Sequence, residues 1–216
     1  MAARASGDAV ADLRREEMLA AAATLIAERG FGDTRIADVA ARVGASPALV
    51  IYYFGTKDSL LTEALRWSER SFYVATEEML RSTATIKARL ETLAEWTLVS
   101  DVQASQTSDW GLWFDLWAQA FRHPEVKKDR AELDAQWRDL ISRVVRAGIS
   151  DGEIAEVDVE TFAIMWGSLL DGLMVQVALE DPVVDVARAR RIAVDVAFKE
   201  LGIASGPARR RTRKKG

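Results

Sequence analysis

Few side chains in this sequence could take part in covalent or metal chemistry. The 216 residues include no cysteine and one histidine, His123. A thiolate nucleophile and a metal site built from several histidines are therefore excluded, and a Ser/His/Asp relay would depend on that one imidazole. Because His123 directly precedes Pro124, it is interpreted as a helix-end residue. The sequence predicts a protein that is not an enzyme and has no metal site and no cofactor.

Tryptophan is the other chemically distinctive residue, with seven copies in the chain. Several aromatic side chains follow helical spacing along one face: Trp110, Trp113, Phe114, Trp117 and Phe121. Others fall on neighbouring predicted helices: Trp96, Trp137 and Trp166. Such aromatics either fill a core or line a cavity between helices, and we favour a ligand pocket for part of the set. With a buried carboxylate such as Asp171, they would suit an amine or quaternary ammonium ligand.

The elements that must position these residues are helices. Helical periodicity runs through almost the whole chain, and no run alternates between apolar and polar residues as a strand does. The expected fold is all-α, with an N-terminal three-helix helix-turn-helix module and a C-terminal helical bundle that dimerises. Helices are expected at about 12–29, 36–43, 47–54, 57–80, 86–102, 109–121, 125–149, 159–179 and 186–201.

The segment from Ile36 to Phe54 has the pattern of a helix-turn-helix. Gly44 can adopt the left-handed turn conformation, and Ser46 with Pro47 can cap and begin the next helix. In such a motif the second helix lies in the major groove of DNA, with its first residues facing base edges. The predicted DNA contacts are Thr34, Arg35, Ser46, Pro47, Ala48, Leu49, Tyr52, Tyr53 and Lys57.

The chemistry of these residues favours phosphate contacts and apolar contacts. The second helix contains no arginine or glutamine that could bind a base in bidentate fashion, so specificity would depend partly on DNA shape. Tyr52 or Tyr53 could instead pack in the core of the small module. Ser46 caps its helix whether or not it contacts DNA.

An ordered string of residues in this region resembles the TetR family of transcriptional regulators. The string comprises Gly30 and Phe31, Thr34, Ile36–Ala40, Gly44, Ser46 and Tyr52–Leu60. The resemblance covers about residues 13–65. It implies a dimer whose two recognition helices enter successive major grooves of a pseudo-palindromic operator, with Tyr53, Phe54 and Lys57 at the family's phosphate-binding positions.

The stretch 110–125 resembles the C-terminal domain of the choline-responsive, BetI-like branch of this family, which implies a small cationic or amphipathic effector. Residues suited to a subunit interface occur on the last two expected helices: Gly167, Leu170, Leu173, Ile192 and Val196. In the family these helices form a four-helix bundle between subunits. The alternative is packing within one chain.

The charge distribution separates the C-terminal tail from the rest of the chain. Six bases fall in the last eight positions, and without them 23 bases face 33 acids. Contact with DNA must therefore come from a local arrangement. We expect a disordered arm at 1–11, a helix-turn-helix domain at 12–56, a ligand-binding and dimerisation domain at 57–203, and a basic disordered tail at 204–216. The tail could also add salt-sensitive DNA affinity.

These features predict a cytoplasmic, ligand-responsive transcriptional regulator that binds operator DNA as a homodimer and has no membrane contact. Glu16 and Glu17 precede the early apolar run Met18–Ala27, which argues against a signal peptide. A repressor released by its small-molecule effector is expected, although corepression or activation would use the same parts. The alternatives are a nonspecific architectural DNA-binding protein and a helical enzyme, for which the sequence offers no catalytic pair.

Overall fold

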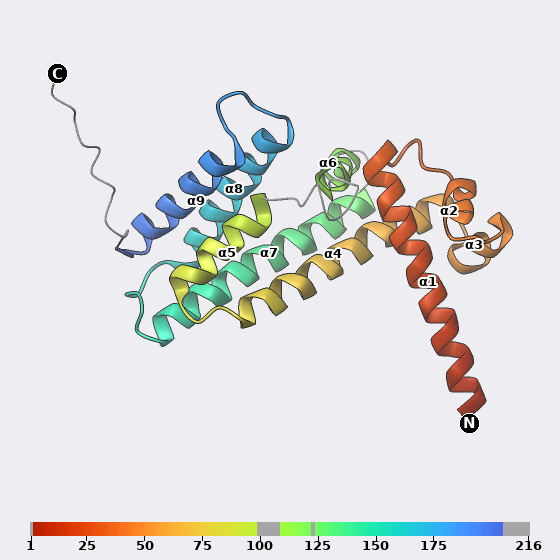
Figure 1. The fold of residues 1–216 in the computed structure, drawn as a ribbon, viewed down its shortest axis with the longest axis horizontal. Coiled ribbons are helices and arrows are strands. Elements are labelled where there is room, and N and C mark those ends of the chain that lie inside the picture. Colours follow the sequence, from red (N-terminus) through yellow and green to blue (C-terminus); the bar gives the residue numbers. More distant parts are fainter. Residues whose placement is uncertain (1, 99–108, 122–123, 205–216) are drawn as a thin grey trace, which may run out of the picture. The chain divides into compact units, whose positions relative to one another are not determined.

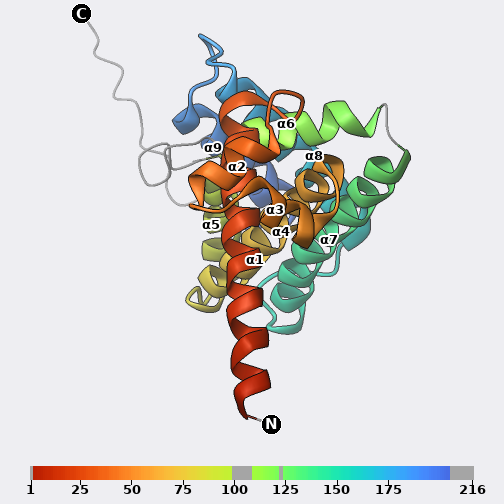
Figure 2. The same ribbon diagram turned by 90° about the vertical axis from the view of Figure 1, so that its right-hand side faces the viewer.

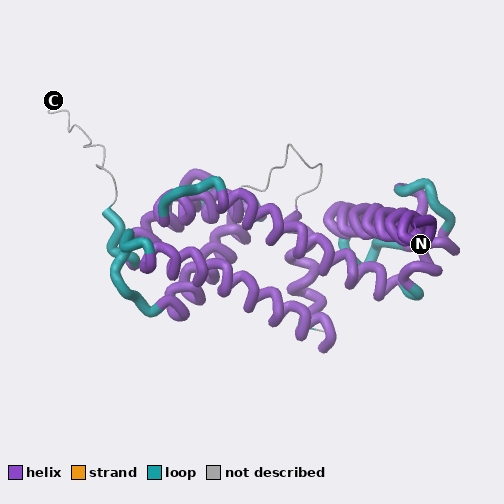
Figure 3. The backbone as a smooth tube through the Cα atoms, turned by 90° about the horizontal axis from the view of Figure 1, so that it is seen from below, coloured by secondary structure: helices purple, strands orange, loops and turns teal. Residues whose placement is uncertain are grey.

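The computed structural model describes residues 2–98, 109–121 and 124–204, and over these residues it contains helices and connecting loops but no strand (Figures 1 and 3). The helices are α1 (Ala2–Arg29), α2 (Ile36–Arg42), α3 (Pro47–Phe54), α4 (Lys57–Arg81), α5 (Ile86–Leu98), α6 (Asp109–Ala120), α7 (Pro124–Ser150), α8 (Val159–Ala178) and α9 (Val186–Glu200). The all-α prediction is confirmed. The expected continuation of α5 to Val102 and the basic tail from residue 205 lie outside the described residues.

The first helix starts earlier than expected. It begins at Ala2, whereas the periodicity placed its start at about Asp12 and left 1–11 as a disordered arm. The physical reason is composition, because this segment is rich in alanine, the residue with the highest helix propensity. The helix ends as expected at Gly30, whose φ is 86° and whose N–H donates to the Ile26 carbonyl oxygen at 2.7 Å.

Contacts divide the described chain into two compact units. One comprises residues within 1–78 and 100–135, and the other comprises residues within 79–99 and 136–216. The helices α4 and α7 have residues in both units. This grouping differs from the expected boundary at 56/57, because Leu60, Leu61 and Ala64 of α4 belong to the same core as α1 and α3. The functional division into domains stays a prediction.

The first unit is organised around the apolar stripe of α1. Five side chains of this stripe are almost completely buried: Met18, Leu19, Ala22, Leu25 and Ile26. The same core contains Val39 and Ala40 of α2, Val50 and Phe54 of α3, and Leu116 of α6. In this unit α2 packs against α1 and α3 packs against α2 (Figure 2). The two short helices are thus held by burial against a longer one.

The second unit is formed by α5, α8, α9 and the later part of α7. Here α5 packs against α9 and α8, and α8 packs against α9 (Figure 1). The small residues Ala189, Ala193 and Ala197 form a buried stripe on α9. Trp166 of α8 is completely buried, stacks on Phe162 with ring centroids 5.9 Å apart, and donates its indole N–H to the Ala193 carbonyl oxygen at 2.9 Å.

Three of the residues expected at a subunit interface are buried inside this unit. Leu170 and Leu173 are core residues, and a Cβ at Gly167 would lie 3.2 Å from Nε1 of Trp137. Packing within one chain therefore accounts for all three, as the alternative interpretation held. Ile192 and Val196 of α9 are half-buried. The exposed face of α8 is a different one, which includes Met165, Ser168 and Gly172 and continues to the C-cap residue Leu179.

Among the described helices, α8 alone is long and apolar enough to cross a membrane by length and composition. Seven of its residues are buried in the protein, and it packs against α5 and α9. Its apolar character is that of a core helix, so its length is weak evidence for a membrane span.

Replacing Trp166 with phenylalanine should destabilise the protein by about 1–3 kcal/mol, because the core would lose the indole hydrogen bond and the smaller ring would leave a void. The shift of the urea unfolding midpoint measures this effect. Phe121→Leu is the control, since Phe121 is 90% exposed and its replacement should change stability by less than about 0.5 kcal/mol. Equal effects of the two substitutions would contradict the role assigned to the buried indole.

Candidate DNA interface and aromatic site

The connection between α2 and α3 is a tight turn with a capped helix on its far side. Val43 is the C-cap of α2, and Gly44 follows with a φ of 62°. Ser46 then caps α3, its Oγ accepting a hydrogen bond from the Leu49 N–H at 3.2 Å, and Pro47 occupies the first position of the helix. Each residue singled out for the turn thus has the expected role, and α2 with α3 forms the predicted helix-turn-helix.

The helix α3 presents four side chains outward. Pro47, Ala48, Ile51 and Tyr52 are exposed, and their spacing places them on one face of the helix. Tyr52 is 81% exposed and Ile51 is 47% exposed. This outward face, defined here as the α3 face, includes three of the predicted DNA contacts and adds Ile51.

The other α3 residues predicted to contact DNA are less accessible. Leu49 and Tyr53 are half-buried against the core of the first unit. The rings of Tyr52 and Tyr53 meet edge to face, with centroids 5.6 Å apart. The alternatives considered for this pair were core packing and DNA contact. Tyr53 packs against the core of the module, whereas Tyr52 points away from it and is accessible.

The polar residues that flank α2 and α3 also differ in their exposure to solvent. Thr34 is completely buried, and its hydroxyl donates to the Gly30 carbonyl oxygen at 2.8 Å, so its side chain stabilises the turn after α1 and does not face solvent. Arg35 is exposed at the start of α2. Lys57, at the start of α4, is half-buried and donates from Nζ to the Gly32 carbonyl oxygen at 2.6 Å. Of these three, Arg35 has the most accessible side chain.

Most bases of the helix-turn-helix region are paired with acids. Arg14 pairs with Glu17 at 2.6 Å, Arg42 with Glu28 at 2.9 Å, and Arg15 with Glu63 of α4. The hydrogen bond from Arg42 is the main cause that holds the pKa of the Glu28 carboxyl below its usual range, and the positive charges of Arg42 and Arg29 act in the same direction, against a smaller desolvation effect. Glu28 therefore stays ionised and paired at neutral pH.

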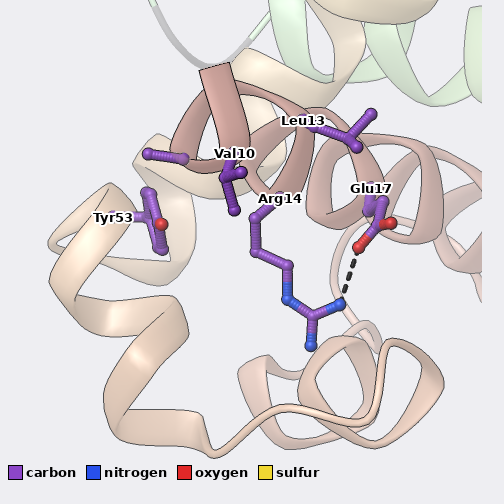
Figure 4. Close-up of a pocket in the computed structure, with 6 residues that line it drawn as sticks. Val10, Leu13, Arg14, Glu17 and Tyr53 are labelled. Carbon is purple, nitrogen blue, oxygen red and sulfur yellow. Dashed lines mark hydrogen bonds and ion pairs between the residues drawn. The ribbon is translucent and has the colours of Figure 1, made fainter. Parts of the chain in front are cut away.

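An open pocket of about 470 Å³ lies between α1 and α3 (Figure 4). Its lining residues are Val10, Ala11, Leu13, Arg14, Glu17 and Tyr53. Figure 4 shows the guanidinium of Arg14 beside the carboxylate of Glu17, with Tyr53 on the opposite wall. Among the described side chains, no tryptophan that was predicted to bind a ligand lines this pocket.

A group of aromatic side chains from α4 and α6 lies elsewhere in the first unit. Trp113 meets Phe72 of α4 edge to face at 6.3 Å, and Phe114 meets Trp117 in the same way at 6.0 Å. The guanidinium carbon of Arg130, on α7, lies 5.0 Å from the centre of the Trp117 ring. Arg130 also pairs with Asp134 at 3.3 Å. We call Phe72, Trp113, Phe114, Trp117 and Arg130 the aromatic site.

The remaining candidate ligand residues belong to the second unit or are not described. Trp166 is a core residue with a bonded indole N–H, which favours the packing interpretation for this side chain. Trp137 packs over Gly167, Trp96 is exposed, and Asp171 is half-buried on α8. The Trp110 side chain lies outside the described residues, as does His123. Of the predicted residues whose side chains the structure describes, Trp113 and Trp117 belong to the aromatic site.

The helix α6 also docks against the end of α1. The Cβ that Gly111 lacks would lie 3.0 Å from the Ala27 carbonyl oxygen, so a larger residue could not fit there without a shift. One turn later, Asp115 accepts a hydrogen bond from the backbone N–H of Phe31 at 2.6 Å, across 84 positions of sequence. The helix that contributes Trp113 and Trp117 therefore also holds the turn between α1 and α2.

Several of these residues were not predicted from the sequence. Ile51 could have been predicted, because it lies three residues after Ala48 and four after Pro47 and therefore shares their face of the helix. Phe72 and Arg130 could not, since helical spacing assigns a residue to a face but does not say which other helix that face meets. The same limit applies to Asp115, whose partner is a backbone group far away in the sequence.

Family models match both parts of the chain. Residues 18–64 match the model of bacterial regulatory proteins of the tetR family, and residues 86–200 match that of the C-terminal domain of BetI-type transcriptional repressors. These two matches identify a DNA-binding transcriptional repressor and not an enzyme. The chain belongs to the TetR family, as the resemblance of its sequence predicted.

Individual relatives agree with this assignment. The HTH-type transcriptional repressor KstR2 of Rhodococcus jostii is 31% identical over 156 residues, which cover 68% of this chain and 71% of the relative. The HTH-type transcriptional regulator BetI of Proteus mirabilis is 26% identical, over 88% of this chain and 93% of its own. A solved structure of a transcriptional regulator from Saccharomonospora viridis, in complex with choline, has a TM-score of 0.74 and 27% identity, and covers 86% of this chain and 95% of that one.

Asp115→Ala should destabilise the protein by about 1–3 kcal/mol, because the part-buried Phe31 N–H would lose its acceptor. Asp115→Asn keeps an acceptor oxygen and should cost less. Thermal or urea unfolding measures both. The control is Asp139→Ala, whose carboxylate is 54% exposed and pairs with Arg143 one turn along the same helix, so that little stability should be lost. A loss no larger for Asp115→Ala than for Asp139→Ala would contradict the assigned contact.

Proposed function

We propose that this protein is a ligand-responsive repressor that binds a pseudo-palindromic operator as a homodimer in the cytoplasm and is released by a small-molecule effector. The observation that carries the DNA-binding part is the α3 face, whose accessible side chains extend from a capped helix-turn-helix turn. In this class of motif the second helix enters the major groove.

The proposed contacts follow from accessibility. Ser46, Pro47 and Ala48 open α3, where a hydroxyl and small apolar surfaces could meet base edges and thymine methyl groups. Ile51 and Tyr52 extend the same face. Arg35 would bind phosphate, and Lys57 could do so only by leaving the Gly32 carbonyl oxygen. With no bidentate base reader on α3, discrimination would rest partly on DNA shape.

Dimerisation would use the exposed face of α8. Met165, Ser168, Gly172 and Leu179 recur at intervals of three, four and seven residues, and all are exposed. A Cβ at Gly172 would meet no atom within 4 Å, so a second helix could approach closely at this point. Ile192 and Val196 of α9 are also proposed to contribute to this dimer interface. A two-fold interface of this kind would place two copies of α3 on two half-sites.

The effector would be a small organic cation of the quaternary ammonium class. Similarity to BetI-type repressors and to a regulator bound to choline supports this class. The aromatic site adds a physical argument, because the face of Trp117 already holds a cation, the guanidinium of Arg130. An effector could replace Arg130 there, with Asp134 as an available counter-charge.

Release of DNA would follow from the attachment of α6. An effector that moves Trp113 or Trp117 also strains the bond between Asp115 and the Phe31 N–H, which lies at the turn leading into α2. By linkage, an effector that disfavours the DNA-binding arrangement weakens operator binding by the same factor by which the operator weakens effector binding. The two affinities should therefore be coupled reciprocally.

Selection of genomic fragments on the purified protein at near-physiological salt should enrich one short imperfect palindrome, bound by two chains. Tyr52→Ala should then weaken binding to this operator about tenfold without lowering thermal stability, since Tyr52 is 81% exposed. The control is Phe121→Ala, an aromatic residue 90% exposed outside the helix-turn-helix, which should bind like the wild type. Binding without any preferred sequence would favour the architectural alternative and refute the repressor proposal.

Choline should bind the protein, as measured by calorimetry, and should weaken its affinity for the selected operator. The neutral isostere of choline, in which a tert-butyl group replaces the trimethylammonium, should bind far more weakly because it cannot take part in cation–π attraction. Trp117→Leu should weaken choline binding about tenfold, whereas Trp96→Leu, on an exposed indole of the other unit, should not. Equal binding of choline and its isostere would rule out recognition of the cation.

A further inference from the structure

Arg14 holds the turn of the helix-turn-helix from the side of α1. Its Nη2 donates to the Val43 carbonyl oxygen at 2.8 Å, and its Nη1 bonds Glu17 at 2.6 Å. Val43 is the C-cap of α2, so its carbonyl is one of the groups that a helix end leaves without a partner inside the helix. A guanidinium is well suited to this position because it complements the negative end of the helix dipole.

The next residue, Arg15, contacts the last residue of α3. Its guanidinium carbon lies 5.1 Å from the centre of the Phe54 ring, and Phe54 is the last residue of α3. The same guanidinium pairs with Glu63 of α4. Phe54 is only 6% exposed, so Arg15 covers a side chain of the core and links it to the following helix.

Consecutive residues of α1 therefore contact the end of α2, just before the turn that leads into α3, and the last residue of α3. The α3 helix has eight residues, which is too few for a helix to be stable on its own, so its direction depends on contacts with the rest of the unit. Burial of Val50 and Phe54 attaches α3 to the core, but apolar contact is not directional. The hydrogen bond to Val43 before the turn and the ring contact at Phe54 supply the directional restraint that burial lacks.

Neither arginine is available as a simple phosphate ligand. Arg14 has a carboxylate and a carbonyl as partners, and Arg15 has a carboxylate and an aromatic face. From this arrangement we propose that Arg14 and Arg15 are positioning residues for DNA recognition. They fix the angle at which α1 presents the α3 face, and discrimination between operator and unrelated DNA depends on them although they do not touch DNA. The inference rests on the proposed operator binding.

The principal variant and its matched control are double substitutions that leave the net charge unchanged. Arg14→Gln/Glu17→Gln removes the restraint on the turn together with its counter-charge, and Glu17→Gln alone keeps the bond to Val43. Arg143→Gln/Asp139→Asn is the matched control, since it removes an exposed pair within one helix that lies outside the helix-turn-helix. Arg14→Lys can restore one donor, so it should recover part of the effect. Each full-length protein is measured for binding to the selected operator and to an unrelated duplex over a range of salt, and for hydrogen exchange.

In the Arg14→Gln/Glu17→Gln variant we expect the ratio of operator to unrelated affinity to fall by at least about tenfold, the effect of losing one charge-assisted hydrogen bond. The slope of log affinity against log salt should stay that of the wild type, and amide exchange should accelerate within residues 44–54. Equal losses on both DNAs, with the slope reduced by about one, would make Arg14 a phosphate contact and overturn the proposal.

The positioning proposal would also be overturned if both the ratio of operator to unrelated affinity and the amide exchange within residues 44–54 stayed at their wild-type values. If the wild type itself prefers no sequence, the repressor proposal has failed, and the exchange data decide the positioning role by themselves. Acceleration confined to 44–54 would then support the restraint, and wild-type exchange there would refute it. Because exchange is read along the whole chain, a general loss of stability is distinguished from a local release of α3.

Discussion

The DNA-binding module depends on burial of the apolar stripe of α1. Helices of seven and eight residues, such as α2 and α3, are not stable alone in water, so they need a surface to pack on. Met18, Leu19, Leu25 and Ile26 provide that surface, and each is at most 1% exposed. Polar contacts then fix the ends and orientations of the helices that burial brings together. The hydroxyl of Ser46 starts α3, that of Thr34 fixes the turn after α1, and the guanidinium of Arg14 ends α2.

The same core joins the helix-turn-helix to the aromatic site. Leu116 of α6 is buried among the side chains of α1–α4, and Asp115 beside it binds the turn that leads into α2. The neighbouring residues on this helix, Trp113, Phe114 and Trp117, form most of the aromatic site. The aromatic site and the helix-turn-helix therefore belong to one packed unit, so the proposed effector would act on the helix-turn-helix without a separate relay between them.

Much of this fold was predictable from the sequence because its helix ends have local causes. Gly44, Ser46 and Pro47 act through their own backbone or their nearest neighbours, and the structure shows each in its predicted role. Thr34 shows the limit, because a threonine beside a turn looks the same in sequence whether its hydroxyl faces phosphate or the Gly30 carbonyl oxygen. The tryptophans show it again: helical spacing placed Trp117 and Trp166 on faces, but only packing decides that one meets Arg130 and the other Ala193. Contacts between distant segments carry no local signature.

The pairing of bases with acids in residues 10–64 has a kinetic consequence. This segment has six bases against eight acids, and Arg14, Arg15, Arg29 and Arg42 all lie beside carboxylates. Such a surface attracts polyanions weakly from a distance, so association gains little from electrostatic steering. Sliding along arbitrary duplex also needs sequence-blind affinity for the backbone, which phosphate-neutralising bases normally supply. Without the six bases of the C-terminal tail, a helix-turn-helix of this kind would search a chromosome mainly by short, repeated collisions and would form a lasting complex only where the α3 face fits the duplex well.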